Sequence, residues 1–384
     1  MFKTMHRVGV LLLVLSSFPL VFAQDTEPPL LIHLSVPDAG IVQSDLYRYT
    51  DNQWEPVTSG GYKGGFRLSP DGTQIAYQIA PDFLRELVEE HGAGHLSTAA
   101  QDIAVLDLTT GEQQIIAGQP SDVEISEDNQ NFSGGVKRSQ PVWSPDGNAL
   151  AWTEQDYPEQ DGVARLVLAD LTSGEIRVLD DALPQITMSS DGLPAFLSWG
   201  EAGIVVFTND PDDGEETFRF YDPAAGTMQI IRDSSEAAWL PTSDLLWVDD
   251  GVLVVEQDVM NWLLVDPESG MATGLNNQLE FVSAVNPDAS LRLLWDIYAL
   301  PGANQWQLLS PDGNVLESWG DALELAQLVM SPSGQAIAYL QGSEVHLWQD
   351  GAVTTLSLPE GMTANELFWG HMSVQFGAEY SSVG

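Results

Sequence analysis

Short segments in which apolar and polar residues alternate follow one another along most of the chain. Gln335–Leu340 is one example, and the segments of this kind are rich in β-branched and aromatic side chains. This pattern is typical of short β-strands, and the Gly, Pro, Asp and Ser residues between the segments are typical of tight turns. We therefore expect an all-β protein built from many short hairpins.

One hairpin motif recurs from one end of the chain to the other. A large apolar residue precedes a Ser-Pro-Asp-Gly turn and an apolar strand at Leu68–Gly72, at Trp143–Gly147 and, with Ser in place of Asp, at Met330–Gly334. Pro presets φ at the second turn position, Asp caps the turn, and Gly takes the left-handed conformation that closes it. Degraded copies keep the anchor position at Trp199, Trp247, Val285 and Trp369.

A second hairpin motif lies between the copies of the first. It consists of an apolar strand, Asp, a few small or polar residues, Gly and another strand. Its clearest copies are Asp107–Gly111, Asp170–Gly174, Asp222–Gly226 and Asp266–Gly270, and shorter variants lie at Asp51–Asn52, Asp312–Gly313 and Asp350–Gly351. One hairpin of each kind makes a four-stranded antiparallel meander.

Together the two motifs predict one β-propeller domain, 24–384, made of four-stranded blades. The later anchors are spaced by the ~40–50 residues of such a blade, and seven hairpins of each kind predict seven blades. The chain begins with a second-type hairpin, Asp45–Thr58, and ends with a first-type hairpin, Glu366–Phe376. Pairing these ends would close the ring and remove its last sheet edges. Leu30–Val36 competes with Met372–Phe376 for one position, so six or eight blades remain alternatives.

The first motif carries a family likeness. Pro141–Gly147 followed by Ala149–Thr153 resembles the TolB-type propeller repeat, a relative of WD repeats, and so do the copies at 69–77 and 331–339. The resemblance implies a propeller and, as in TolB, a periplasmic platform that binds proteins. Similar repeats form the propeller domains of some serine peptidases and of various surface proteins. No catalytic residue belongs to the repeat, so none is transferred. We expect no counterpart of the N-terminal α/β domain of TolB, because only a few residues precede the first strand.

The first residues have the pattern of an export signal. Lys3 and Arg7 give a basic start, Val8–Phe22 is apolar, and Ala23 is the small residue expected before a cleavage site. We predict that 1–23 is removed and that the mature protein is periplasmic or extracellular. The apolar stretch is shorter than the roughly 20 residues of a membrane span. A retained N-terminal anchor is the alternative, and no span is expected in the mature chain.

The chain is strongly acidic. It has 13 Lys and Arg against 56 Asp and Glu, and its formal net charge is −43. This charge repels nucleic acid and anionic lipid and attracts basic partners or multivalent cations. Solubility outside the cytoplasm would explain the charge without a specific docking surface. The absence of Cys excludes disulfides, thiolate metal sites and a lipid-modified N-terminal Cys.

Two insertions, about 80–100 and 118–140, interrupt the succession of hairpins. Pro81–His95 has the pattern of a short amphipathic helix, either packed on one rim of the ring or capping its channel. His91 and His95 have the spacing of helical metal ligands, but the Gly-Ala-Gly sequence around them argues against a helix there. The second insertion is polar, which favours a solvated loop over a binding loop.

The densest acidic cluster is the candidate metal site. Asp210, Asp212, Asp213 and Glu215 offer the hard oxygen ligands that calcium prefers. Pro211 interrupts the spacing of a helical calcium loop. An acidic turn between two strands is therefore the favoured interpretation, with calcium as the alternative and no other cofactor expected.

Catalysis finds little support in the sequence. It contains no Gly-x-Ser-x-Gly elbow and no phosphate-binding Gly-Lys-Ser/Thr loop. The Trp residues at anchor positions fit the core between blades better than a carbohydrate platform. We therefore expect an exported, non-catalytic, monomeric propeller that is a platform for a protein partner and binds no nucleic acid. The alternative is an enzyme, or a glycan- or cation-binding protein, that uses the axial channel.

Overall fold

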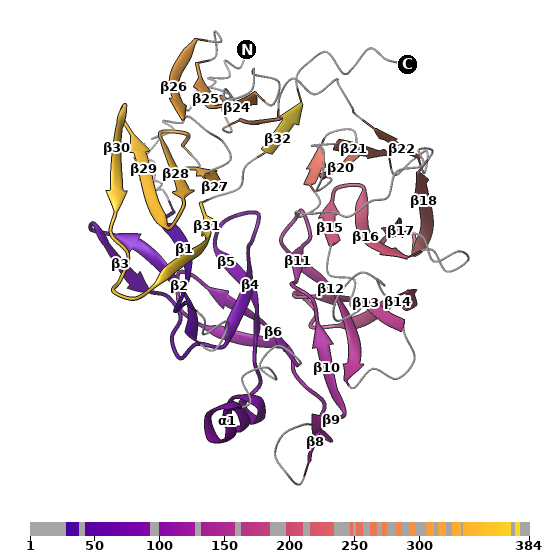
Figure 1. Cartoon of the computed structure of the whole chain (residues 1–384). Coiled ribbons are helices and arrows are strands. Elements are labelled where there is room, and N and C mark those ends of the chain that lie inside the picture. The colour runs from indigo at the N-terminus through magenta and orange to yellow at the C-terminus, as the bar shows by residue number, and fades with distance from the viewer. Residues whose placement is uncertain are drawn as a thin grey trace, which may run out of the picture.

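The protein is described by a computed structural model that covers residues 28–37, 43–92, 100–126, 132–157, 163–184, 197–209, 216–233, 246–248, 251–255, 262–266, 271–274, 282–285, 292–296, 305–310, 314–319, 325–331, 333–369 and 373–376. Within these residues the regular structure is β-strand except for one helix, α1 (Asp82–His91). The strands form antiparallel sheets that follow one another around a ring (Figure 1). The predicted all-β class is confirmed.

The first half of the chain supplies three sheets. The first has the order β3-β2-β1-β31 and contains β1 (Leu30–Ser35), β2 (Ser44–Thr50), β3 (Gln53–Pro56) and β31 (Thr363–Phe368). The second has the order β4-β5-β6-β7 and contains β4 (Lys63–Leu68), β5 (Gln74–Ile79), β6 (Asp102–Asp107) and β7 (Gln113–Ala117). The third has the order β10-β12-β13-β14, with β11 beside β12, and contains β10 (Gly135–Arg138), β11 (Val142–Trp143), β12 (Ala149–Tyr157), β13 (Val163–Asp170) and β14 (Ile176–Pro184). A small hairpin, β8 (Glu124–Ile125) with β9 (Phe132–Ser133), precedes the third sheet.

The second half supplies the remaining sheets. An eight-stranded sheet consists of two meanders joined by a parallel pair between β18 and β22. Its strands are β15 (Leu197–Gly200), β16 (Gly203–Asn209), β17 (Glu216–Asp222), β18 (Thr227–Asp233), β19 (Leu246–Val248), β20 (Gly251–Val255), β21 (Trp262–Asp266) and β22 (Met271–Gly274). A five-stranded sheet contains β23 (Val282–Val285), β24 (Arg292–Asp296), β25 (Gln305–Leu309), β26 (Val315–Trp319) and β32 (Ser373–Phe376). The last sheet contains β27 (Leu325–Met330), β28 (Ala336–Gln341), β29 (Glu344–Gln349) and β30 (Ala352–Leu356).

The two ends of the chain meet in the first sheet. β1 lies between β2 and β31, and Leu31 is opposite Phe368. The N- and C-terminal strands therefore share a sheet, as predicted, but the predicted terminal hairpin Glu366–Phe376 is wrong, because β32 pairs with β23. β1, rather than the segment Met372–Phe376, pairs with β31, because both faces of β1 are apolar: Leu31 is 3% exposed, and Ile32 and Leu34 are 0% exposed. Such a strand suits a place between two other sheets.

Each sheet packs its apolar side chains against the next. Ile32 belongs to a buried cluster with Ala338 of the last sheet, whereas Leu31 belongs to one with Tyr77 of the second sheet. Trp143, an anchor of the first motif, is 7% exposed and donates a hydrogen bond from Nε1 to the carbonyl oxygen of Arg67 at 2.8 Å. The core position predicted for this anchor is confirmed.

The first insertion forms the predicted helix, but a shorter one. α1 ends at His91 and is capped by Gly92, whose φ of 69° is left-handed and whose N–H donates to the carbonyl oxygen of Val88 at 2.8 Å. Leu84 and Leu87, on the buried face of α1, pack in one cluster with Phe132 of β9. His95 lies outside the described residues, so the disfavoured alternative, in which it pairs with His91 on a metal, stays untested. No helix within the described residues is long and apolar enough to cross a membrane.

Candidate functional site

The two ends of the sheets carry different kinds of connection. Consecutive connections alternate between the ends, because neighbouring strands run in opposite directions. The turns of the repeated motifs lie at one end, which we call the short-turn rim and which includes 69–73, 107–112, 144–148 and 170–175. Longer connections leave from the other end, which we call the long-connection rim and which includes 57–62, 80–101, 118–134 and 357–362.

On the short-turn rim, the polar side chains of the repeated turns form hydrogen bonds within the turns themselves. Asp146 accepts hydrogen bonds from Ser144 Oγ at 2.6 Å and from the N–H of Asn148 at 3.1 Å. Asp170 accepts one from the N–H of Ser173 at 2.8 Å. These bonds lower the pKa of both carboxyl groups. The largest effect comes from Ser144 at Asp146 and from the N–H of Ser173 at Asp170. The motif aspartates therefore close hairpins, as the sequence predicts.

On the long-connection rim, the insertions pack against one another. Phe83 of α1 meets Phe132 of β9 edge-on, with ring centroids 5.5 Å apart, and Phe132 lies 4.6 Å from Tyr157 at the end of β12. Lys137 Nζ lies 5.6 Å from the centroid of Tyr157. Figure 1 shows α1 and the β8–β9 hairpin side by side at the lower edge of the ring. We call α1, the β8–β9 hairpin and the end of β12 the insertion lobe.

Polar contacts join the same connections more tightly. The side chain of Gln119 donates to the carbonyl oxygen of Gln101 at 2.9 Å and accepts from the N–H of Val136 at 2.7 Å. Arg138, whose side chain is 6% exposed, donates to the carbonyl oxygens of Gln101 at 2.7 Å and Gly118 at 3.0 Å, and pairs with Glu154 at 3.0 Å. These bonds fix both insertions to the ends of the second and third sheets.

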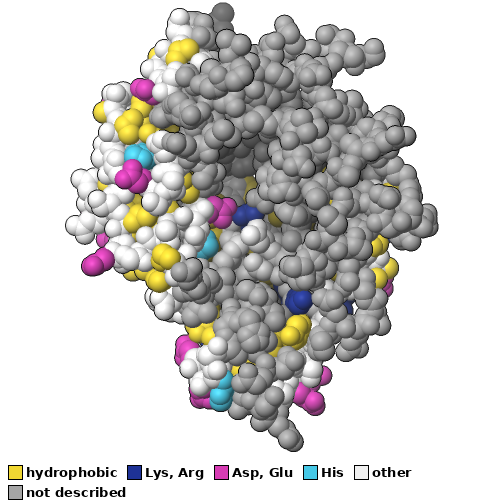
Figure 2. Space-filling view, viewed as in Figure 1, with side chains coloured by type: hydrophobic (Ala, Val, Ile, Leu, Met, Phe, Trp, Pro, Cys, Tyr) yellow, Lys and Arg dark blue, Asp and Glu magenta, His cyan; other side chains and the backbone are white. Residues whose placement is uncertain are grey.

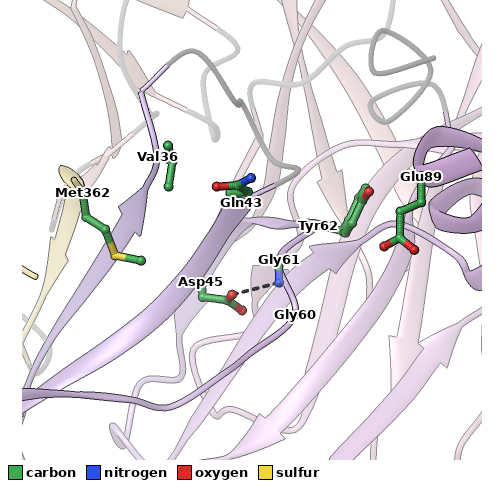
Figure 3. A pocket seen from close by; sticks show the side chains of 8 residues that line it. All are labelled: Val36, Gln43, Asp45, Gly60, Gly61, Tyr62, Glu89 and Met362. Carbon is green, nitrogen blue, oxygen red and sulfur yellow. Dashed lines mark hydrogen bonds between the residues drawn. The ribbon is translucent and has the colours of Figure 1, made fainter. Parts of the chain in front are cut away.

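A pocket of about 370 Å³ opens on this rim, where the first two sheets meet (Figure 3). The connections β1–β2 and β3–β4, the segment before β31 and the helix α1 all contribute to it. Its lining residues are Val36, Gln43, Asp45, Gly60, Gly61, Tyr62, Glu89 and Met362. In Figure 3, Val36 and Met362 form one end of the pocket, and Tyr62 and Glu89 form the other. The pocket thus has an apolar end and a polar, acidic end.

Asp45 fixes the floor of this pocket. Its Oδ1 accepts hydrogen bonds from Thr58 Oγ1 at 2.7 Å and Lys63 Nζ at 3.1 Å, and its Oδ2 accepts one from the N–H of Gly61 at 2.8 Å. Lys63 Nζ also donates to the carbonyl oxygens of Ser59 at 2.7 Å and Gly61 at 2.8 Å. The carboxylate and the ammonium group therefore neutralise each other while they hold the loop 58–63 in place.

The loop on this floor has an uncommon backbone. Gly60, Gly61 and Tyr62 all have left-handed φ angles, of 88°, 67° and 59°. A tyrosine rarely adopts this conformation without strong local constraints. Burial raises the pKa of the Tyr62 hydroxyl, the negative charge of Glu89 raises it further, and the positive charge of Arg85 opposes this only in part. The hydroxyl is therefore a hydrogen-bond donor at neutral pH.

Beside the pocket, His33 and Ser44 resemble a catalytic pair but are not one. His33 Nε2 lies 2.5 Å from Ser44 Oγ, and Ser44 Oγ donates its proton to the carbonyl oxygen of Lys63 at 2.6 Å. The histidine must therefore donate from Nε2. A protonated Nε2 cannot take the proton of the serine, so His33 does not activate Ser44 as a base. Burial lowers the pKa of His33 to about 4, and the nearby charge of Asp45 opposes this only in part. The pair is structural.

The inner strands carry a separate polar cluster. Arg67 of β4 lies 3.2 Å from Glu366 of β31 and donates to the side chain of Gln140 at 2.5 Å. Figure 2 shows acidic, basic and histidine side chains close together near the middle of the same face. Because the charges of Arg67 and Glu366 are paired, this cluster joins three segments of the ring.

The acidic cluster predicted as a metal site, Asp210, Asp212, Asp213 and Glu215, lies outside the described residues. Across the parts of the chain that the structure describes, no group of three or more His, Cys, Asp or Glu side chains could hold a metal ion. The pocket was not predicted from the sequence. The one local signal is the Ser59-Gly60-Gly61 turn, which interrupts two predicted strands.

No protein-family model and no curated protein matches this chain. The successive four-stranded antiparallel meanders, packed face to face and joined at the chain ends, decide the fold. The chain folds as a β-propeller. The propeller resembles TolB from Acinetobacter baumannii, with 13% identity, a TM-score of 0.37, and 91% of this chain and 66% of TolB covered.

The propeller also resembles parts of peptidases. A prolyl endopeptidase is 13% identical, with a TM-score of 0.46, and the match covers 84% of this chain and 46% of the peptidase. The β-propeller domain of the trilobed protease from Pyrococcus furiosus is 15% identical, with a TM-score of 0.42, and 77% and 83% of the two chains are covered. The chain spans less than two thirds of TolB and less than half of the endopeptidase. These likenesses concern the fold alone.

Proposed function

We propose that this protein is a non-catalytic propeller that binds another protein through its long-connection rim. One observation carries the proposal: the insertions on this rim are joined into a lobe beside a pocket, whereas the described turns of the other rim use their polar groups internally. Binding surfaces in repeat folds are built from the connections that the scaffold does not need. The long-connection rim has such additions, and they are held rigidly by Gln119 and Arg138.

The charge of the chain favours a basic partner. The formal net charge is −43, so a partner with a positive surface would be attracted over a distance of about 8–10 Å at physiological salt. The same charge disfavours nucleic acid. We further propose that the propeller is monomeric and acts outside the cytoplasm, after removal of 1–23, which the sequence pattern of Lys3, Arg7 and Ala23 supports.

We also propose seven blades. Among the described strands, the eight-stranded sheet divides at the parallel pair β18–β22 into two four-stranded meanders. With that division, the first three sheets, these two meanders, the β23–β26 sheet and the β27–β30 sheet make seven units. β32 is then an additional strand on the β23–β26 unit.

A pair of exposed isoleucines offers a matched test of the binding face. Ile125 lies on the β8–β9 hairpin of the long-connection rim and is 44% exposed, and Ile176 starts β14 beside the short-turn rim and is 47% exposed. Immobilised mature protein would be used to capture a partner from the native envelope fraction. We expect Ile125→Lys to lose the captured partner and Ile176→Lys to keep it.

Two results would overturn the proposal. One is a partner that is lost with Ile176→Lys and kept with Ile125→Lys. The other is turnover of a substrate by the purified protein, with no partner captured above background. Intact-mass measurement of the exported protein tests the proposed processing, because cleavage after Ala23 leaves a chain that starts at Gln24.

A further inference from the structure

The pocket between the first two sheets has one carboxylate that the protein does not neutralise. Asp45 is paired with Lys63, which lies beneath the lining. Glu89 is exposed, and within the described residues it forms no ion pair. None of the lining residues is Lys or Arg. Among the lining residues, the end formed by Glu89 and Tyr62 therefore carries a carboxylate and no cation.

The neighbours of Glu89 add hydrogen-bonding groups around the same space. Figure 3 shows the side chain of Glu89 beside Tyr62, with the side chain of Gln43 between Tyr62 and the apolar end. An amide oxygen and a phenolic oxygen both accept hydrogen bonds, as a carboxylate does. An ammonium group has three donors and no acceptor, so it matches this set of groups. The guanidinium of Arg85 also lies close enough to act on the Tyr62 hydroxyl, but it is paired with Asp82 and does not line the pocket. An anionic ligand would therefore meet the carboxylate of Glu89 first.

The other end of the pocket suits an aliphatic chain. Val36 and Met362 lie there (Figure 3), and the charged lining residue on their side, Asp45, is paired with Lys63. A methionine side chain adapts its shape to different apolar partners. The volume of about 370 Å³ accommodates a lysine side chain together with a neighbouring apolar side chain.

The floor is rigid enough to select a ligand. Asp45 and Lys63 hold the loop 58–63 with five hydrogen bonds, and Tyr62 is locked in a left-handed conformation. A pocket whose shape is fixed before binding loses less conformational entropy when it is filled.

We infer that this pocket binds a lysine side chain of the partner, with the ammonium group at Glu89 and the adjoining apolar part against Val36 and Met362. The inference rests on the proposed protein-binding role, and it names the chemistry that the partner must present. It also explains how an acidic propeller would select one basic segment rather than attract every cation.

The probe is a short capped peptide in which a single lysine lies next to leucine, compared with the same peptide carrying Nε-acetyl-lysine. Fluorescence anisotropy at physiological salt gives the affinity for the full mature protein. We expect the lysine peptide to bind at least ~10-fold more tightly than the acetylated one, as for the loss of one charge-assisted hydrogen bond. Glu89→Gln should remove this preference.

Glu86→Gln is the matched control, because Glu86 is exposed on the same helix but does not line the pocket. We expect its affinity for the lysine peptide to stay within ~2-fold of the unmodified protein. Equal binding of both peptides, equal losses in Glu86→Gln and Glu89→Gln, or no binding of either peptide would overturn the inference. If Ile125→Lys still loses the native partner while Glu89→Gln keeps it, the pocket assignment fails and the proposed function stands.

Discussion

Lys63 Nζ lies 3.1 Å from Asp45 Oδ1, and the two side chains are only 5% and 15% exposed. This buried pair joins the start of β2 to the start of β4, and it supports the floor of the pocket.

Replacing Lys63 by Met should therefore be strongly destabilising. The substitution leaves the Asp45 carboxylate buried without its counter-charge, which typically costs about 3–5 kcal/mol. Urea unfolding would measure the loss. Arg48→Met is the control, because Arg48 pairs with Glu55 at the surface, where the side chains are 45% and 51% exposed, and such pairs contribute about 0–1 kcal/mol. Similar losses in the two variants would contradict the assigned role.

The closure of the ring can be tested with a disulfide, because the chain has no cysteine of its own. Ser35 of β1 is opposite Thr363 of β31. We expect the double variant Ser35→Cys, Thr363→Cys to crosslink under oxidising conditions and to gain about 2–4 kcal/mol of stability, chiefly by restricting the unfolded chain. Melting with and without reductant isolates the effect. Failure to form the crosslink would place the two strands apart.

The third copy of the first motif offers a stabilising change. Ser333 stands where the other clear copies have Asp, and its Oγ lies 3.2 Å from Ser331 Oγ. In the second copy, Asp146 accepts from both Ser144 and Asn148. Ser333→Asp should supply the same acceptors and stabilise the protein by up to about 1 kcal/mol. Ser333→Ala is the comparison, and thermal unfolding should rank Asp above Ser and Ser above Ala.

The buried His33 should make the protein sensitive to mild acid. Burial lowers its pKa from 6.5 to about 4. Between these values the unfolded chain binds a proton that the folded chain does not, so stability falls as the pH falls. The loss should reach about 2 kcal/mol between pH 6.5 and 5. His33→Gln should flatten this part of the profile, measured by urea unfolding. A profile that His33→Gln leaves unchanged would contradict the assignment.

The sequence predicted the parts of the fold that depend on local chemistry. The turns at Asp146 and Asp170 formed as expected, because each turn is closed by residues within a few positions of it. The partner of β31 depended instead on contacts between residues more than 300 positions apart, and only the apolar character of both faces of β1 hinted at it.

The pocket illustrates the same limit. Tyr62, Glu89 and Met362 come from three separate connections, and none of them belongs to a motif. The local density of acidic residues along the sequence indicated Asp210–Glu215 as a site instead. Convergence of unlike residues from distant connections has no signature in a single sequence.

The pairing of β1 with β31 also has a consequence for synthesis. Ribosomes make β1, β2 and β3 early, but the strand that covers the inner edge of their sheet is completed only near the C-terminus. Until then that sheet has an unpaired inner edge, which is a template for wrong pairing. A chain released or truncated before Thr363 would keep this edge open, so quality-control factors could distinguish it from the finished protein by one strand.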